Sequence, residues 1–86
     1  MSSFIALDYE TANSSYESVC AIGATVVLDG KITSNIYSLI KPPKEHFFFD
    51  SFNVSIHGIT EKDVKNAPGF EKVWQEIEEL IVSNNL

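Results

Sequence analysis

The chain has 86 residues, of which 44% are hydrophobic and 21% are charged, and its formal net charge at pH 7 is −6. This length allows one small domain, and such a domain buries only about 60% of the surface that its unfolded chain exposes. The composition excludes a disordered chain, and no apolar run approaches the roughly 20 residues that are needed to span a bilayer.

Three strands are expected in the first half of the chain. The apolar run FIAL near the N-terminus is typical of a strand that is buried on both faces. The next apolar segment, VCAIGATVVL, is rich in β-branched residues, and Asp29-Gly30 behind it predicts a tight hairpin into a third strand, which Pro42-Pro43 ends. We therefore expect strands at about 3–9, 19–28 and 31–40.

Two helices are expected in the second half. Residues 44–55 are rich in phenylalanine and have no regular pattern, so we expect an irregular segment there. The sequence TEKD at 60–63 matches a capping box and predicts a short helix at about 60–66. Helical spacing of apolar residues then predicts a longer helix at about 70–82. Three strands followed by helices are typical of an α/β or α+β domain.

The first predicted strand ends in two acids, Asp8 and Glu10. Residues i and i+2 of a strand project to the same face, so the two carboxylates converge. Because like charges repel, a cation between them would stabilise both, and Mg²⁺ or Mn²⁺ prefers such oxygen ligands. The pattern D-x-E is common, however, and on spacing alone a solvated strand end before a polar loop is the better interpretation.

The context of these acids makes the pattern more specific. The segments FIALDYETA, SVCAIGATVVLDGKI, YSLIKPP and SIHGITEKDVKNAPGFEKVWQEI together cover most of the chain. They resemble the start of a DnaQ-like (DEDD-type) 3′–5′ exonuclease, the superfamily of the proofreading epsilon subunit of bacterial DNA polymerase III. The resemblance implies an α/β, partial ribonuclease H-like fold, in which the three strands form an antiparallel meander.

The resemblance also implies a site. Asp8 and Glu10 match the catalytic carboxylates that bind two Mg²⁺ or Mn²⁺ ions, Thr11 would lie beside the terminal nucleotide, and Ile56 and His57 would line the pocket for the 3′-terminal nucleoside. The implied substrates are 3′ ends of single-stranded DNA or RNA, and the implied partner is a DNA polymerase. On pattern alone, His57 could instead cap a helix that starts at 58–60.

Two further aspartates and a general-base histidine of this superfamily come from a second and a third motif. The sequence LIVSNNL stands about where the second motif is expected. We therefore expect residues 1–86 to be the N-terminal portion of a single exonuclease domain, which is inactive by itself. The alternative is an inactive fragment or a nucleic-acid- or protein-binding module, in which unpaired strand edges lead to self-association.

Other residues have simpler interpretations. All six basic residues are lysines, and the absence of arginine argues against a dedicated nucleic-acid-binding module. Lys41 and Lys44 could meet phosphates, although solubility explains them equally well. Glu17 could approach the site, but a solvated loop acid is the better interpretation. The aromatic residues of 47–52 could stack bases, but they are expected to pack a loop onto the core. The single cysteine, Cys20, excludes an internal disulfide; together with the absence of a basic leader it predicts a cytoplasmic protein without a membrane segment.

Overall fold

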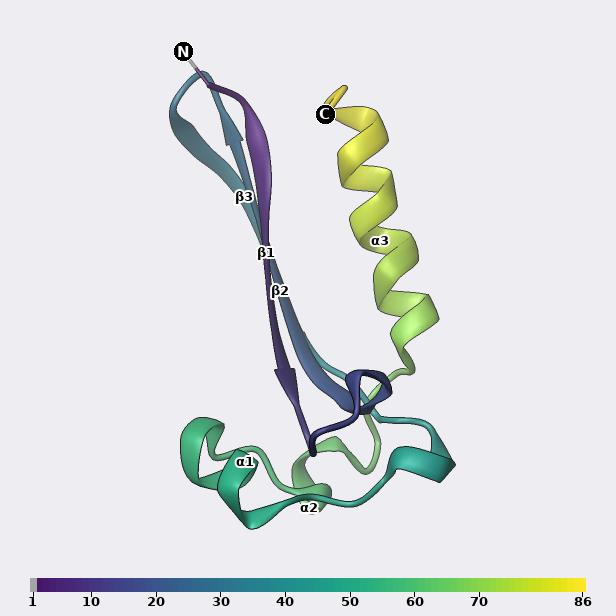
Figure 1. Ribbon diagram of the computed structural model, residues 1–86. Coiled ribbons are helices and arrows are strands. Elements are labelled where there is room, and N and C mark those ends of the chain that lie inside the picture. Colours follow the sequence, from purple (N-terminus) through teal and green to yellow (C-terminus); the bar gives the residue numbers. More distant parts are fainter. Residues whose placement is uncertain (1) are drawn as a thin grey trace.

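The computed structural model describes residues 2–86. Its three strands form one antiparallel sheet in the order β1-β2-β3, which confirms the predicted meander and the α/β class. One helix lies along a single face of this sheet, and the shorter helices lie beyond the end of β1 (Figure 1). The strands are β1 (Phe4–Thr11), β2 (Val19–Leu28) and β3 (Lys31–Leu39), and the helices are α1 (Ser51–His57), α2 (Glu61–Val64) and α3 (Phe70–Ser83). Two 3-10 turns, η1 (Tyr16–Ser18) and η2 (Lys44–His46), complete the structure.

The hairpin between β2 and β3 forms as predicted. Asp29 and Gly30 both have a positive φ, 50° and 78°. Two successive residues with positive φ make the type I′ turn, whose twist matches that of the flanking strands. The turn places Leu28 opposite Lys31 and so sets the register of the two strands.

The apolar stripe of α3 packs against the sheet, as its spacing predicted. Val73 and Ile77 of α3 are buried against Ile22 and Ala24 of β2. The ring of Trp74 is partly buried and stacks on Phe70, with ring centroids 5.9 Å apart. This core between α3 and the sheet stabilises the fold, because burial of each such aliphatic side chain contributes about 1.5–3 kcal/mol.

A second buried cluster lies where β1 and β2 meet the short helices. Its buried members are Ala12, Cys20, Ala21, Ile59 and Val64. Phe47 and Phe49 pack against this cluster and contact each other edge to face, with centroids 5.9 Å apart. Phe48 and Phe52 are 58% and 69% exposed, so the expectation that these aromatic residues pack onto the core is confirmed for only two of the four.

The expected irregular segment at 44–55 is wrong in its last part, because α1 begins at Ser51. The Asp50 side chain accepts a hydrogen bond from the Phe52 backbone N–H at 2.9 Å, which caps the first turn. Gly58 ends the helix with a φ of 73°, a left-handed conformation that glycine adopts without strain. No residue of α1 is fully buried, and its apolar residues Phe52 and Ile56 are 69% and 67% exposed, so the helix has no apolar stripe that faces the core.

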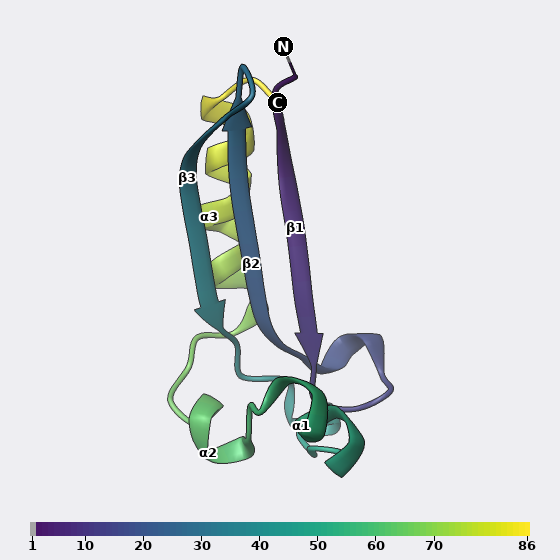
Figure 2. The ribbon, with the colours of Figure 1, turned by 90° about the vertical axis from the view of Figure 1, so that its left-hand side faces the viewer.

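The expectation that β1 is buried on both faces is also wrong. Phe4 and Tyr9 are each 46% exposed and Leu7 is 37% exposed. In residues 2–86, β1 pairs only with β2, and α3 covers only one face of the sheet. Figure 2 shows the opposite face, with α3 behind the strands. We call this uncovered surface the open face. Within the same residues, no helix is both long and apolar enough for a bilayer crossing.

Candidate active site

The strand register places Asp8 and Glu10 on the open face. Asp8 lies opposite Gly23, and Glu10 lies opposite Ala21. Directly opposed residues of a sheet share a face, and neighbours along a strand alternate between faces. Because Ile22 of β2 packs against α3, its neighbours in β2 and their partners in β1 face the other way. Both carboxylates therefore project to the side that α3 leaves uncovered.

The two acids line one shallow depression of about 210 Å³. It is lined by residues of all three strands, by His57 at the end of α1 and by Ile59 after that helix. Its lining residues are Asp8, Glu10, Ala21, Ile22, Gly23, Tyr37, His57 and Ile59. The structure thus brings together three of the residues singled out in the sequence, namely the two acids and His57.

A β-bulge ends the pairing of β1 with β2 beside this depression. Glu10 pairs with Ala21, whereas the next residue, Thr11, pairs with Val19, so Cys20 is the extra residue. Bulges bend a strand and redirect its side chains, and they are frequent next to active sites. After the bulge, the chain leaves the sheet with the Ala12 backbone N–H donating to Ser18 O at 2.8 Å. The sequence gives no local signal for this bulge.

His57 connects α1 to the end of β1. Its Nε2 lies 2.9 Å from the Thr11 carbonyl oxygen, and its Nδ1 lies 2.9 Å from the backbone N of Ile59. A carbonyl only accepts a hydrogen bond and a backbone N–H only donates one, so the ring carries its proton on Nε2 and is neutral. His57 is the last residue of α1 and does not cap the start of the next helix, which corrects the alternative interpretation of its role. The capping residue there is Thr60, whose backbone N–H donates to the Asp63 carboxylate at 2.9 Å.

Asn53 is a second connection between α1 and β1, and sequence reasoning missed it. Its Nδ2 lies 3.1 Å from the Thr11 carbonyl oxygen, 3.3 Å from Thr11 Oγ1 and 3.3 Å from the Asn13 carbonyl oxygen. Asn13 is itself 2% exposed, and its Nδ2 donates to two carbonyls of the 44–49 segment. Thr11 is therefore held by two side chains of α1.

The electrostatics of the depression are dominated by its acids. Among the described residues that line it there is no lysine or arginine. Burial raises the pKa of the Cys20 thiol to about 11, and the negative charge of Glu10 adds to this effect. Asp8 and Glu10 are not part of a larger ligand group: among residues 2–86, no three histidine, cysteine or acidic side chains lie close enough together to hold a metal ion. Asp8 and Glu10 are therefore the two acids that this depression brings together.

The remaining candidates lie away from this depression. Ile56 is 67% exposed on α1 and does not line it. Glu17 is exposed, as expected of a solvated loop acid, and its carboxylate lies 2.9 Å from His46 Nε2. The Lys41 Nζ lies 5.8 Å from the centroid of the Phe47 ring.

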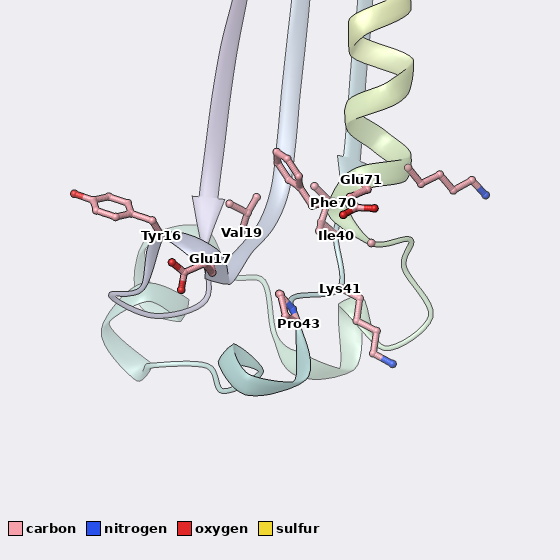
Figure 3. A pocket seen from close by; sticks show the side chains of 10 residues that line it. Tyr16, Glu17, Val19, Ile40, Lys41, Pro43, Phe70 and Glu71 are labelled. Carbon is pink, nitrogen blue, oxygen red and sulfur yellow. The ribbon is translucent and has the colours of Figure 1, made fainter.

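A larger depression of about 430 Å³ lies on the other side of β2, next to the start of α3. Figure 3 shows Val19, Ile40 and Phe70 gathered there, with Lys41 at its margin. Glu17 and Glu71 are its only acids among the described residues, and neither Asp8 nor Glu10 reaches it. It is therefore separate from the candidate site.

A meander with one helix along it makes the chain an α/β domain, and two acids project from its open face. Its similarity to solved exonucleases shows that the fold is a partial ribonuclease H-like one. The family described as Exonuclease (RNase_T) matches residues 5–86. The chain belongs to this exonuclease family, and the match covers nearly its whole length.

One relative is a DNA polymerase III of the PolC type from Thermotoga petrophila (strain ATCC BAA-488 / DSM 13995 / JCM 10881 / RKU-1). It is 30% identical over 89 residues, which is 95% of this chain and 6% of that protein. Together with the family match, this similarity confirms the predicted resemblance at the level of the exonuclease family.

Three solved structures are similar, each with a TM-score of 0.75. Exonuclease X in complex with 5′ overhanging duplex DNA is 27% identical, over 85% of this chain and 42% of that chain. A full-length 3′-exonuclease and a 3′-exonuclease that recognises a histone mRNA stem-loop are each 18% identical over 95% of this chain, and this covers 29% and 40% of their own lengths. At this identity the latter two show the fold alone. The chain spans less than half of each of these relatives.

Proposed function

We propose that this chain carries the first metal-binding motif of a 3′–5′ exonuclease that hydrolyses phosphodiesters with two metal ions. The observation that carries the proposal is the placement of Asp8 and Glu10 side by side on the open face, in a depression that also receives His57. The family match to exonucleases supports the reaction class. The 3′–5′ polarity rests on the resemblance to the DnaQ-like enzymes.

The two acids fit a hard divalent cation. Both offer carboxylate oxygens, the ligands that Mg²⁺ and Mn²⁺ prefer, and Mg²⁺ binds with few protein carboxylates because it keeps several of its waters. When bound in pairs, such ions activate a water molecule and stabilise the leaving oxygen of a phosphodiester. In this proposal the carboxylates of Asp8 and Glu10 hold the metal.

The residues around Thr11 would hold the terminal nucleotide. Thr11 follows directly after the acidic motif, and His57 and Asn53 fix its carbonyl. Both ring nitrogens of His57 are already occupied, by Thr11 and by Ile59, so its role is to position this segment and not to transfer a proton. Ile56 is exposed on the adjoining helix and would offer an apolar surface to the nucleoside.

The substrate in this proposal is the 3′ end of a single-stranded DNA or RNA. Exonuclease X was solved with DNA, and a 3′-exonuclease of the same fold was solved with an mRNA stem-loop, so both sugars occur among the relatives. The PolC-type relative supports an association with a DNA polymerase. We further propose that residues 1–86 are the N-terminal portion of an exonuclease domain and that the remaining ligands come from other segments.

The proposal is tested by Mn²⁺ titration of the ¹⁵N-labelled 86-residue chain. Paramagnetic broadening is expected first at the amides near Asp8, Glu10 and Gly23. Asp8→Asn and Glu10→Gln should abolish this selective broadening, because each removes one charged ligand. Glu17→Gln is the matched control, since Glu17 is an exposed acid outside the depression. Selective broadening that persists in Asp8→Asn would refute the metal site. The alternative function, a nucleic-acid- or protein-binding module, would then be favoured.

A further inference from the structure

Tyr37 of β3 lies at the rim of the depression opposite to the acids. Asp8 pairs with Gly23 across β1 and β2, and Gly23 pairs with Tyr37 across β2 and β3. The three residues therefore form one row on the open face. Two strand spacings separate the ends of this row, a distance of about 10 Å between the Cα atoms.

Gly23, in the middle of this row, has no side chain and so leaves space between Asp8 and Tyr37. A Cβ atom built on Gly23 would lie 3.8 Å from Cδ1 of Tyr37, so the tyrosine ring leans over β2. Tyr37 is nevertheless 67% exposed, although it lies within strand β3. Its ring is thus supported at one edge by the sheet, and most of its surface is open to solvent.

The neighbouring row of the open face carries no charge. It consists of Ala6, Thr25 and Asn35, and the Thr25 hydroxyl donates to Asn35 Oδ1 at 2.8 Å. A polyanionic strand that entered over this row would meet small and neutral polar side chains and no further carboxylate. The negative charge of the open face is concentrated at Asp8 and Glu10, where a bound cation would offset it.

We propose that Tyr37 is a substrate-contacting residue that stacks on the base of the nucleotide preceding the 3′-terminal one in a single strand. This inference rests on the proposed function, because the acids and His57 must first receive the terminal linkage at the other rim of the same depression. An aromatic ring stacks on any base, so the contact would select for a second nucleotide without selecting its sequence. The depression would thus distinguish a strand end from a free mononucleotide.

The test compares the binding of two ligands to the 86-residue chain in the presence of Ca²⁺, which takes the same oxygen ligands as Mg²⁺. The affinity for 5′-fluorescein-labelled (dT)₄ is measured by fluorescence anisotropy, and the affinity for dTMP is measured by competition. Tyr37→Ala should weaken (dT)₄ binding about tenfold, and Tyr37→Phe should change it less than twofold. The matched control is Tyr16→Ala, which removes a tyrosine that is 93% exposed and lies outside this depression.

Unchanged dTMP affinity in Tyr37→Ala, together with the loss for (dT)₄, is the result that supports the inference. An equal loss for both ligands would mean that Tyr37 acts through the fold or the acids, and an unchanged (dT)₄ affinity would mean that the ring makes no contact; either overturns the inference. A loss in Tyr37→Phe as large as in Tyr37→Ala would overturn stacking in favour of the hydroxyl. If the wild-type chain binds neither ligand, the proposed function itself fails, whereas dTMP binding that Asp8→Asn removes keeps that function in place.

Discussion

Replacement of His57 by alanine tests whether α1 is held to the end of β1 by the two hydrogen bonds of its ring. The Nε2–H donates to the Thr11 carbonyl, and Nδ1 accepts from the Ile59 backbone N–H, each at 2.9 Å. The two lost bonds have different consequences. Thr11 O keeps a donor, Asn53 Nδ2 at 3.1 Å, whereas the backbone N–H of Ile59, a residue that is only 8% exposed, loses its acceptor.

The cost follows from this difference. An intramolecular hydrogen bond contributes about 0.5–1.5 kcal/mol net, and a buried donor without a partner costs about 1–3 kcal/mol. Because the Thr11 carbonyl remains bonded, the Ile59 amide dominates, and we expect His57→Ala to lower the free energy of unfolding by about 2 kcal/mol. For a domain of this size, that corresponds to a decrease of roughly 8–16 °C in Tm.

Urea and thermal unfolding, followed by circular dichroism, would measure this change. His46→Ala is the matched control, because His46 pairs with a mostly exposed Glu17 and should contribute less than about 1 kcal/mol. A double-mutant cycle with Asn53→Ala adds a second criterion. The double variant leaves Thr11 O without either side-chain donor, so its loss should exceed the sum of the single losses by at least about 0.5 kcal/mol. A loss below about 0.5 kcal/mol in His57→Ala, or additive losses in the cycle, would refute this account of α1.

Two further predictions concern the buried clusters. Ile77→Ala should lower the free energy of unfolding in urea by about 2–5 kcal/mol, because Ile77 is fully buried between α3 and the sheet. Val82→Ala on the same helix, at a residue that is 78% exposed, should change it by less than about 0.5 kcal/mol. Similar losses in both variants would contradict the packing of α3. Because the pKa of the Cys20 thiol is raised from 9.0 to about 11, the unfolded chain ionises first, so stability should fall as the pH rises from about 9 to 11. This slope should disappear in Cys20→Ala, and a slope that is equal in both proteins would contradict the buried thiol.

The parts of the fold that could be predicted are those with a local cause. The hairpin follows from the positive φ values that Asp29 and Gly30 adopt, and α3 follows from apolar residues at helical spacing. The helix α1 has local signals only at its ends, where Asp50 and Gly58 cap it, because its apolar residues Phe52 and Ile56 face solvent and not the core. The exposure of Leu7 could not be predicted either, since it depends on which elements cover the sheet and not on the strand's own sequence.

The candidate site divides in the same way. The spacing of Asp8 and Glu10 predicts a shared face because the strand period is two. The contact of His57 with Thr11 joins residues 46 positions apart, and it depends on the path of the chain through α1. Asn53 has no pattern in the sequence that distinguishes it from a loop asparagine, and its role becomes visible only when its amide reaches Thr11 and Asn13.

The position of the acids is determined by packing on the opposite face of the sheet. A slip of one residue in the pairing of β1 would turn Asp8 and Glu10 towards α3 and bring Leu7 to the open face. The alternation in β2 opposes this slip, because Ile22 and Ala24 are buried against α3 while Gly23 between them leaves room beside Asp8. The bulge at Cys20 then ends the regular pairing of β1 with β2. Side chains of α1 hold Thr11, the residue that follows Glu10. A substitution in the α3 core can therefore change the geometry of the two acids without touching them, so stability and metal affinity should be measured together in every variant of this chain.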